Sequence, residues 1–255
     1  MKEKSIRKDR LNWRDLVIFQ NPAGFCFSLD VVLLADFATI KPKDKVCDLG
    51  CGNGVLPLLL WSREPKAQYT GLEIQKEPLE LAKKSLAENG EKEKGLSQNI
   101  CLIEGDLCRA SELLGRGGFS LVVSNPPYMP KGTGRQHVFQ QIKIAKSEEL
   151  CTLADVIREG SALLNTGGRF AMVHRPQRLA EMMQLMAEYQ LVPKRLRLVE
   201  PAPKENSNMV LIEAVKQGRQ GLLVLPSLVV YSEPQVYSKE IEEILAGRNL
   251  KNPGK

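Results

Sequence analysis

The sequence has few of the residues from which metal centres and disulfide frameworks are built. Only two histidines, His137 and His174, occur among its 255 residues. The six cysteines are scattered and form no Cys-x-x-Cys pair, which disfavours both a zinc site and a disulfide-stabilised fold. We therefore expect no bound metal, and we interpret Cys47 and Cys51 as small packing residues around a loop. The cysteines are Cys26, Cys47, Cys51, Cys101, Cys108 and Cys151.

Long apolar runs are also missing. No segment approaches the roughly 20 apolar residues that a membrane-spanning helix needs. The amino-terminal stretch MKEKSIRKDRLNW is charged and lacks the apolar centre of a secretory signal. These features predict a cytoplasmic protein with no membrane partner.

Acidic residues are outnumbered by basic ones. Lysine and arginine total 36 against 30 aspartates and glutamates, giving a net charge of +6, while 43% of the residues are hydrophobic and 26% are charged. This composition is ordinary for a soluble globular protein with a sizeable core. The charge favours an anionic partner such as nucleic acid, but it is equally compatible with a merely basic soluble protein.

From residue 45 onward, short strand-like segments alternate with helical segments. Such alternation predicts a parallel sheet with helices on both faces. The last two strand-like segments are joined by a short polar loop, which predicts a terminal antiparallel hairpin. The predicted strands cover 45–49, 68–74, 99–103, 119–124, 168–174, 194–200 and 208–215, and the predicted helices cover 54–63, 75–90 and 147–164.

The flanks of this alternating region carry smaller elements. Segments 16–20 and 24–28 surround the turn signal Asn-Pro-Ala-Gly and predict a hairpin that leads into a helix over 29–37. The residues after 215 predict an added strand and a short final helix. We therefore expect an N-terminal hairpin and helix over 1–44, a sheet domain over 45–215, and a C-terminal extension over 216–255 packed on the same domain.

The first strand of the sheet ends in DLGCGNG, which contains Asp48, Gly50, Gly52 and Gly54. Glycines at this position let the backbone approach a ligand closely, and the helix that follows offers free N–H groups. The spacing Gly-x-Gly-x-Gly is not the dinucleotide fingerprint Gly-x-Gly-x-x-Gly. A nicotinamide-dependent oxidoreductase is therefore disfavoured.

Acidic side chains follow the next two strands. Glu73 ends the second strand, about 20 residues after the glycines, where an acid in this kind of fold hydrogen-bonds a ribose diol. Asp106 ends the third strand. Because ligands of open α/β sheets bind along the carboxyl edge, three acids at three successive strand ends predict a ligand site there.

The fourth strand delivers Asn125-Pro126-Pro127-Tyr128 to the same edge. Prolines remove backbone donors and stiffen the chain, so that the side-chain oxygen of Asn125 and the carbonyl of Pro126 become fixed acceptors. Two fixed acceptors suit an NH₂ group. Tyr128 adds a flat face on which a planar ring bearing that amine can stack.

These motifs resemble those of a known enzyme group. DLGCGNG, GLEI, EGDL and NPPY, in this order, are similar to the motifs of S-adenosylmethionine-dependent methyltransferases that modify planar amino nitrogens. The stretch FSLDVVLLADF, the basic hairpin over 194–216 and the tail VLPSLVVY look most like the tRNA (adenine-N(6)) methyltransferase family acting on valine tRNA. The resemblance covers roughly Phe27 to Val215. It implies a Rossmann-like, doubly wound, seven-stranded sheet.

The resemblance also implies how a cofactor is held. The Gly50 to Gly54 loop would lie against the methionine part of S-adenosylmethionine, Glu73 on its ribose hydroxyls and Asp106 near its adenine. Asp30, in the helix before the sheet, would border the methionine end. The expected cofactor-binding residues are Asp30, Asp48, Gly50, Gly52, Gly54, Glu73, Asp106 and Asn125.

The same resemblance implies a reaction. A methyl group would pass from S-adenosylmethionine to the 6-amino group of an adenine in the anticodon loop of a tRNA. Asn125 and Pro126 would grip the amine and Tyr128 would stack on the base. Since the amino edge of a stacked base is buried, the base must be flipped out or lie in a loop. The expected catalytic residues are Asn125, Pro126, Pro127 and Tyr128.

Other readings stay open at this point. A protein glutamine (release factor) methyltransferase uses the same tetrapeptide, although only 44 residues precede Lys45, too few for the helical domain of that type. A DNA adenine methyltransferase would need a separate recognition domain. Another RNA amino-nitrogen methyltransferase and a non-enzymatic RNA-binding scaffold are further alternatives.

Three further features carry weaker predictions. The segment 131–146 holds two glycines and four basic residues, which suits either a lid over the target base or a solvated connector. The basic residues of the terminal hairpin could contact phosphates. His174, Trp13 and Trp61 are expected to be packed side chains rather than catalysts.

Overall fold

The main sheet contains the seven strands that the sequence predicts. The computed structural model describes residues 6–24, 26–126 and 151–248. Two short strands at the edge of the sheet, β10 (Leu223–Val224) and β11 (Leu228–Val229), lie where the sequence predicts one added strand. The predicted strands appear as β3 (Lys45–Leu49), β4 (Gln68–Glu73), β5 (Ile100–Glu104), β6 (Phe119–Ser124), β7 (Leu164–His174), β8 (Leu191–Glu200) and β9 (Met209–Lys216).

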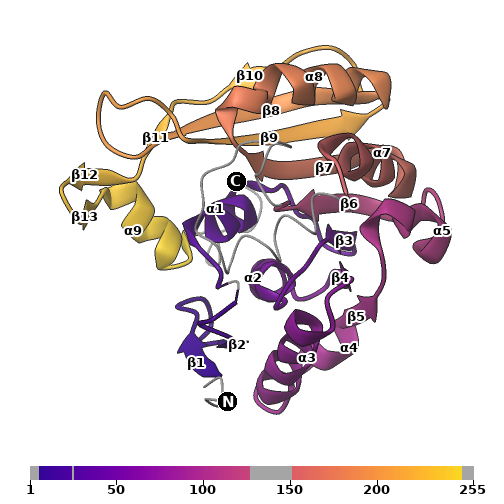
Figure 1. The fold of residues 1–255 in the computed structure, drawn as a ribbon, viewed down its shortest axis with the longest axis vertical. Helices are drawn as coiled ribbons and strands as arrows, with labels where there is room; N and C mark the ends of the chain where they lie inside the picture. Colours follow the sequence, from indigo (N-terminus) through magenta and orange to yellow (C-terminus); the bar gives the residue numbers. More distant parts are fainter. Residues whose placement is uncertain (1–5, 25, 127–150, 249–255) are drawn as a thin grey trace.

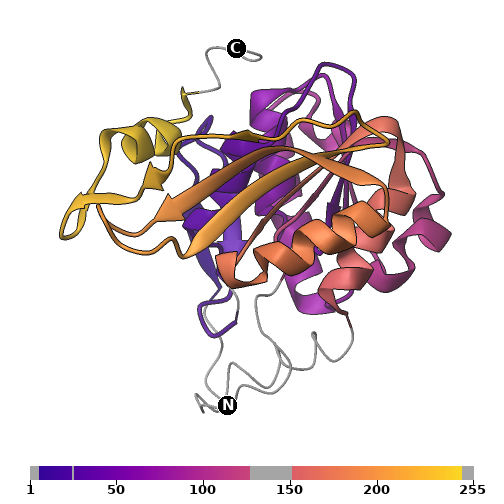
Figure 2. The same ribbon diagram turned by 90° about the horizontal axis from the view of Figure 1, so that it is seen from above.

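The order of the strands confirms a doubly wound, mostly parallel sheet. Within the described ranges the nine-stranded sheet runs β10-β8-β9-β7-β6-β3-β4-β5, and β11 also pairs with β8 (Figure 1). Strands β3 to β7 pair in parallel. The predicted hairpin is antiparallel, and β9 lies between β7 and β8 (Figure 2). The chain therefore reverses its winding next to β3, between β4 and β6.

Helices cover both faces of this sheet. The alternation along β6 separates two cores: Leu121 and Val123 join the cluster that contains the side chains of α1 and α2, whereas Val122 joins the cluster of α7 and α8. This is the period-two pattern of a strand buried on both faces. The main helices are α1 (Leu29–Phe37), α2 (Val55–Arg63), α3 (Lys76–Gly90), α7 (Leu153–Leu163), α8 (Leu179–Glu188) and α9 (Lys239–Leu245).

Several helical elements were not predicted. Helix α8 buries Met182 and Met186 fully but leaves most of its other residues partly or fully exposed, so its apolar face is narrow. The shorter elements are single turns that sequence periodicity does not reveal. They are α4 (Leu96–Asn99), α5 (Ala110–Leu114) and the 3₁₀ turns η1 (Leu107–Arg109) and η2 (Pro176–Arg178).

The N-terminal hairpin forms with a different partner from the one predicted. Strand β2 (Val17–Gln20) pairs with β1 (Arg7–Arg10), and the residues described between Gly24 and Ser28 form no strand. The reason is visible at Gln20, whose side-chain oxygen accepts a hydrogen bond from the Phe27 backbone at 2.8 Å. This bond replaces a strand ladder. The helix predicted over 29–37 is present as α1.

The residues after β9 cover one edge of the sheet and then pack against α1. Strands β10 and β11 run parallel to β8 and pair with its outer edge, which would otherwise expose unpaired backbone groups. A small hairpin of β12 (Tyr231–Glu233) and β13 (Val236–Tyr237) then leads to α9 (Figure 1). The buried indole of Trp13 donates to the Ile244 carbonyl at 2.9 Å. No helix in the described ranges is long and apolar enough to cross a bilayer.

A buried ion pair fastens the amino ends of the central strands. Arg169 on β7 lies 2.6 Å from the carboxylate of Asp44, which precedes β3, and their side chains are only 9% and 7% exposed. The Asp44 carboxylate also accepts hydrogen bonds from Ser120 on β6 and from the backbone of Lys41. One acid thus joins three neighbouring strands.

We expect Asp44→Ala to lower the free energy of unfolding by about 3–5 kcal/mol, because the guanidinium of Arg169 would remain buried without its counter-charge. The matched control is Glu112→Ala, which breaks an ion pair with Arg109 whose side chains are 64% and 67% exposed. That change should cost less than about 1 kcal/mol. Urea unfolding of both variants measures the difference, and equal costs would contradict the assigned role.

Candidate active site

A pocket lies at the carboxyl edge of the sheet, where β3 and β6 end. It opens to solvent, and the space of about 350 Å³ within it includes part of that solvent. It brings together four residues expected from the sequence, namely Asp48, Gly50, Gly52 and Asn125. The other residues that line it are Phe27, Val31, Cys51, Asn53, Val55 and Leu56.

The glycine loop owes its shape to backbone angles that favour glycine. Gly50, Gly52 and Gly54 have φ values of +78°, +55° and +80°, in the left-handed region. A β-carbon on Gly52 would meet nothing within 4 Å, so this stretch of backbone faces open space. At Gly54 a β-carbon would instead lie 2.9 Å from that of Ala82 on α3. Gly52 therefore leaves room for a ligand, whereas Gly54 allows close packing of the helix.

Glu73 holds the loop in place. One oxygen of its buried carboxylate accepts a hydrogen bond from the Gly52 backbone at 2.9 Å, and the other accepts one from the Gln75 backbone at 2.8 Å. Glu73 does not line the pocket itself in the structure. Its observed contacts are with the chain's own backbone, next to the pocket.

Asp48 presents a carboxylate with an unused acceptor. It is buried, and its Oδ2 atom has no hydrogen-bond partner among the described residues. Burial raises the pKa of Asp48 well above its ordinary value, and the negative charge of Glu73 raises it further. A ligand that brings a positive charge or an N–H group into the pocket would stabilise the ionised form.

The segment before α1 forms another wall, which sequence reasoning missed. Phe27 and Val31 line the pocket, and the Gln20 side chain receives hydrogen bonds from both the Phe27 backbone and the Asn53 side chain. No strand-end rule identifies these residues, because they come from a loop and a helix start ahead of the sheet. Their only sequence signal was the FSLDVVLLADF stretch.

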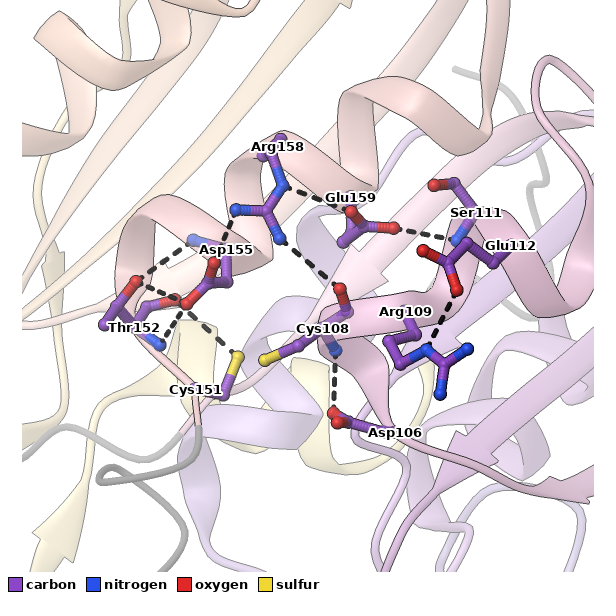
Figure 3. Close-up of polar contacts among 10 residues, drawn as sticks. All are labelled: Asp106, Cys108, Arg109, Ser111, Glu112, Cys151, Thr152, Asp155, Arg158 and Glu159. Carbon is purple, nitrogen blue, oxygen red and sulfur yellow. Dashed lines mark hydrogen bonds and ion pairs between the residues drawn. The ribbon is translucent and has the colours of Figure 1, made fainter.

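Like Glu73, two further expected acids do not line the pocket. Asp30 is buried in the first turn of α1, where its carboxylate accepts hydrogen bonds from Ser28 and from the Val31 backbone at 2.9 Å. Asp106 follows β5 and accepts from the Cys108 backbone at 2.9 Å, capping η1 (Figure 3). Both carboxylates accept hydrogen bonds from residues next to them in the chain, at the start of a helix or turn. Neither lines the pocket.

The tetrapeptide is described only in its first half. Asn125 lines the pocket and is half-buried, and Pro126 is buried. The preceding Ser124 donates to the Leu49 carbonyl at 2.9 Å, which ties the end of β6 to the end of β3. Pro127, Tyr128 and the basic segment 131–146 lie outside the described residues.

Two basic side chains of the terminal hairpin, those of Arg195 and Arg197, are engaged within the molecule. Arg195 stacks on Phe37, with its guanidinium 4.5 Å from the ring centre, and it also pairs with Glu213. Arg197 lies 2.8 Å from Glu240. These two cations serve the packing of β8 rather than a surface for phosphates.

The remaining candidates behave as packed residues. His174 is buried, accepts a hydrogen bond from the Arg175 backbone at 2.8 Å, and has its pKa lowered by burial to about 4. It is therefore neutral near pH 7. Trp13, Trp61 and Cys47 are buried in the core. Cys51 is also buried and touches the pocket.

The pKa of Asp48 predicts a pH dependence of stability. An aspartate titrates near 3.9 in an unfolded chain, so raising its pKa in the folded state makes the folded protein bind the extra proton. The contribution of Asp48 to stability is therefore lost as the pH rises above about 4. Asp48→Asn should gain stability relative to the wild type between pH 4 and pH 7, as measured by urea unfolding at a series of pH values.

Glu181→Gln provides the control of opposite sign. A hydrogen bond and ion pair with Arg178 lower the pKa of Glu181, so its contribution is present above about pH 4 and is lost in acid. The difference in free energy of unfolding between the wild type and Asp48→Asn should change with pH. A difference that stays constant would contradict the assignment of Asp48 as a destabilised carboxylate.

Comparisons with known proteins identify relatives of this chain. Residues 30–195 match the family model of the methyltransferase small domain. A tRNA1(Val) (adenine(37)-N6)-methyltransferase of Porphyromonas gingivalis is 32% identical over 211 residues, which cover 80% of each chain. A protein of the same name from Vibrio campbellii is 24% identical, over 91% of this chain and 95% of the relative.

A solved structure shares the fold over most of its length. It is that of a predicted O-methyltransferase from Agrobacterium tumefaciens, with a TM-score of 0.69 and 25% identity, covering 86% of this chain and 96% of that one. The glycine loop, the acids behind it and Asn125 at the end of β6 all fall within the matched range. The chain belongs to the methyltransferase small domain family, in the group that includes the tRNA1(Val) (adenine(37)-N6)-methyltransferases.

Proposed function

We propose that this protein transfers a methyl group from S-adenosylmethionine to the 6-amino group of an adenine in the anticodon loop of a tRNA. The observation that carries the proposal is the position of Asn125, which lines the same pocket as Asp48 and the glycine loop. An acceptor for an amine thereby stands next to a site suited to a cationic ligand.

The residues of the pocket fit S-adenosylmethionine. Asp48 keeps a buried oxygen without a partner in the described structure, and the backbone at Gly52 borders open space. Asp48 would face the positively charged methionine part, and the loop of Gly50 and Gly52 would allow close backbone contact. When bound, the cofactor supplies a methyl group that its positive sulfur already activates.

Glu73 would serve the cofactor in two ways. Its carboxylate already fixes the glycine loop through the Gly52 N–H. A carboxylate oxygen can accept more than one hydrogen bond, so Glu73 can also receive a ribose hydroxyl without releasing the loop. Asp106 and Asp30, which cap neighbouring turns, would border the adenine and methionine ends respectively.

The tetrapeptide would orient the acceptor amine. The Asn125 side-chain oxygen and the Pro126 carbonyl would accept the two N–H groups, which directs the nitrogen lone pair toward the methyl group. As the new N–C bond forms, the nitrogen gains positive charge, so these acceptors bind the transition state more strongly than the ground state. The nitrogen then releases one proton to water. Pro127 and Tyr128 complete the proposed set, with Tyr128 stacking on the base.

The choice of tRNA as the acceptor has separate supports. Relatives at 32% and 24% identity that span most of the chain are named as tRNA (adenine-N6) methyltransferases. The net charge of +6 is compatible with an RNA partner. Both supports are independent of the amine-binding geometry, which alone does not distinguish an adenine from a glutamine amide.

The proposal is tested with bulk tRNA from a strain that lacks the gene. Recombinant protein and methyl-labelled S-adenosylmethionine should yield labelled N(6)-methyladenosine in nuclease digests analysed by mass spectrometry. The rate should fall as salt is added, because phosphate contacts are screened. Label that enters a glutamine-bearing protein, with none in tRNA, would instead identify a protein methyltransferase.

The role of Asn125 predicts a separation of catalysis from cofactor binding. Asn125→Ala should lower kcat by a factor on the order of 10² to 10³, since one transition-state acceptor is lost. Its affinity for S-adenosylmethionine, measured by calorimetry, should stay close to that of the wild type. Normal turnover of this variant would refute the role.

Glu73→Gln is the complementary variant. The amide keeps one oxygen for the Gly52 N–H but removes the charge and the second oxygen, which accepts from the Gln75 N–H. Cofactor affinity should therefore fall while bound enzyme still turns over. The two variants together distinguish a defect in the amine site from a defect in the cofactor site.

A further inference from the structure

Two cysteine side chains that are far apart in the sequence face each other near the proposed active site. Cys108 lies on η1, just after β5, and Cys151 lies just before α7 (Figure 3). Their sulfur atoms and a carboxylate oxygen of Asp155 all lie within 4.8 Å of one another. Both cysteines are partly buried rather than enclosed in the core. Each cysteine residue therefore keeps part of its surface exposed to solvent.

The surrounding contacts hold the two thiols in position. Helix α7 packs against η1, and Arg158 donates to the Cys108 carbonyl at 3.3 Å. About two turns along α7 from Cys151, Glu159 accepts from the Ser111 backbone at 2.8 Å (Figure 3). These bonds join α7 to η1 and to α5, which follows it. The approach of the thiols therefore follows from the packing of two fixed elements.

A metal ion is the first use to consider for this cluster, but Asp155 is committed elsewhere. One of its oxygens accepts from the backbone and hydroxyl of Thr152, at 2.9 and 2.6 Å, and the other lies 2.5 Å from Arg158. A cation would have to displace this capping box and would meet the positive charge of Arg158. The two thiols thus lack a third ligand that is ready to bind.

We propose that Cys108 and Cys151 form a reversible disulfide, a redox modification site that links η1 to the start of α7. The oxidant is a small-molecule disulfide. The Cys108 thiolate attacks it, forming a mixed disulfide and releasing one thiol. The Cys151 thiolate then attacks the Cys108 sulfur and releases the second thiol. Two electrons pass to the reagent, and the two protons of the cysteines end on its thiols.

The environments of the two thiols assign the order of attack. Burial raises the pKa of both, but a hydrogen bond from the Cys151 thiol acts in the opposite direction on the pKa of Cys108. Cys108 therefore ionises first and is the attacking group. Because both thiols are protonated near pH 7, exchange is slow and calls for incubation over hours.

The test uses the full-length native protein and oxidised glutathione. After incubation, free thiols are blocked with N-ethylmaleimide, and peptides from a non-reducing digest are analysed by mass spectrometry. We expect a cross-linked peptide that joins Cys108 to Cys151 and disappears after treatment with dithiothreitol. Cys101→Ser is the matched control, because Cys101 is exposed on β5 and outside the cluster. This variant should form the same cross-link.

Cys108→Ser and Cys151→Ser should each abolish the cross-link and leave the other thiol either blocked or joined to glutathione. Zinc binding by the reduced protein is measured in parallel. If N-ethylmaleimide labels both cysteines of the wild type completely after incubation with oxidised glutathione, no disulfide has formed. That result would overturn the proposal, whether or not zinc is bound. One equivalent of zinc that is lost in both serine variants would then assign the cluster to a metal.

Discussion

The hydrogen bond between the Gly52 N–H and the Glu73 carboxylate joins the ends of two neighbouring strands, and the shape of the pocket depends on it. The backbone N–H groups of Gly50 and Cys51 add two bonds to the Leu72 carbonyl, at 2.9 and 3.0 Å. Together these three bonds fold the loop back over the end of β4. Val55 and Leu56, in the first turn of α2, line the pocket, at a helix end where backbone N–H groups lack intrahelical partners.

This arrangement has a cost, because it places a second carboxylate near Glu73. Asp48 is buried, has a free acceptor in the described structure, and has its pKa raised by burial and by the charge of Glu73. Buried acids of this kind destabilise a fold unless a ligand satisfies them. The ion pair between Asp44 and Arg169 stands at the opposite end of the same strand, where its charges are matched. The ion pair at the amino end of β3 therefore stabilises a strand whose carboxyl end carries the unfavourable buried carboxylate of Asp48.

The sequence predicted elements whose signals are local and missed those that depend on distant contacts. Strands 45–49 and 119–124 appear with the predicted bounds. A short apolar run bounded by polar residues can be recognised in the sequence without knowing which strand pairs with it. The predicted partner of β2 was wrong, because β2 pairs with β1. The Phe27 backbone N–H donates to the Gln20 side chain instead of to a neighbouring strand. Likewise, glycine spacing located the loop, but it could not distinguish Gly52, which borders open space, from Gly54, which packs on Ala82.

The net charge of the sequence also fails to predict contacts that depend on the fold. A net charge of +6 describes the long-range field of the molecule and attracts a polyanion from a distance. It does not say which cations a phosphate can reach. Arg195 and Arg197, in the basic hairpin, are turned inward onto Phe37 and Glu240. The pocket has one carboxylate among its lining residues, that of Asp48, which suits a cationic ligand. The net charge of the chain and the charge inside the pocket therefore suit different partners, and the contacts of each side chain decide which partner it serves.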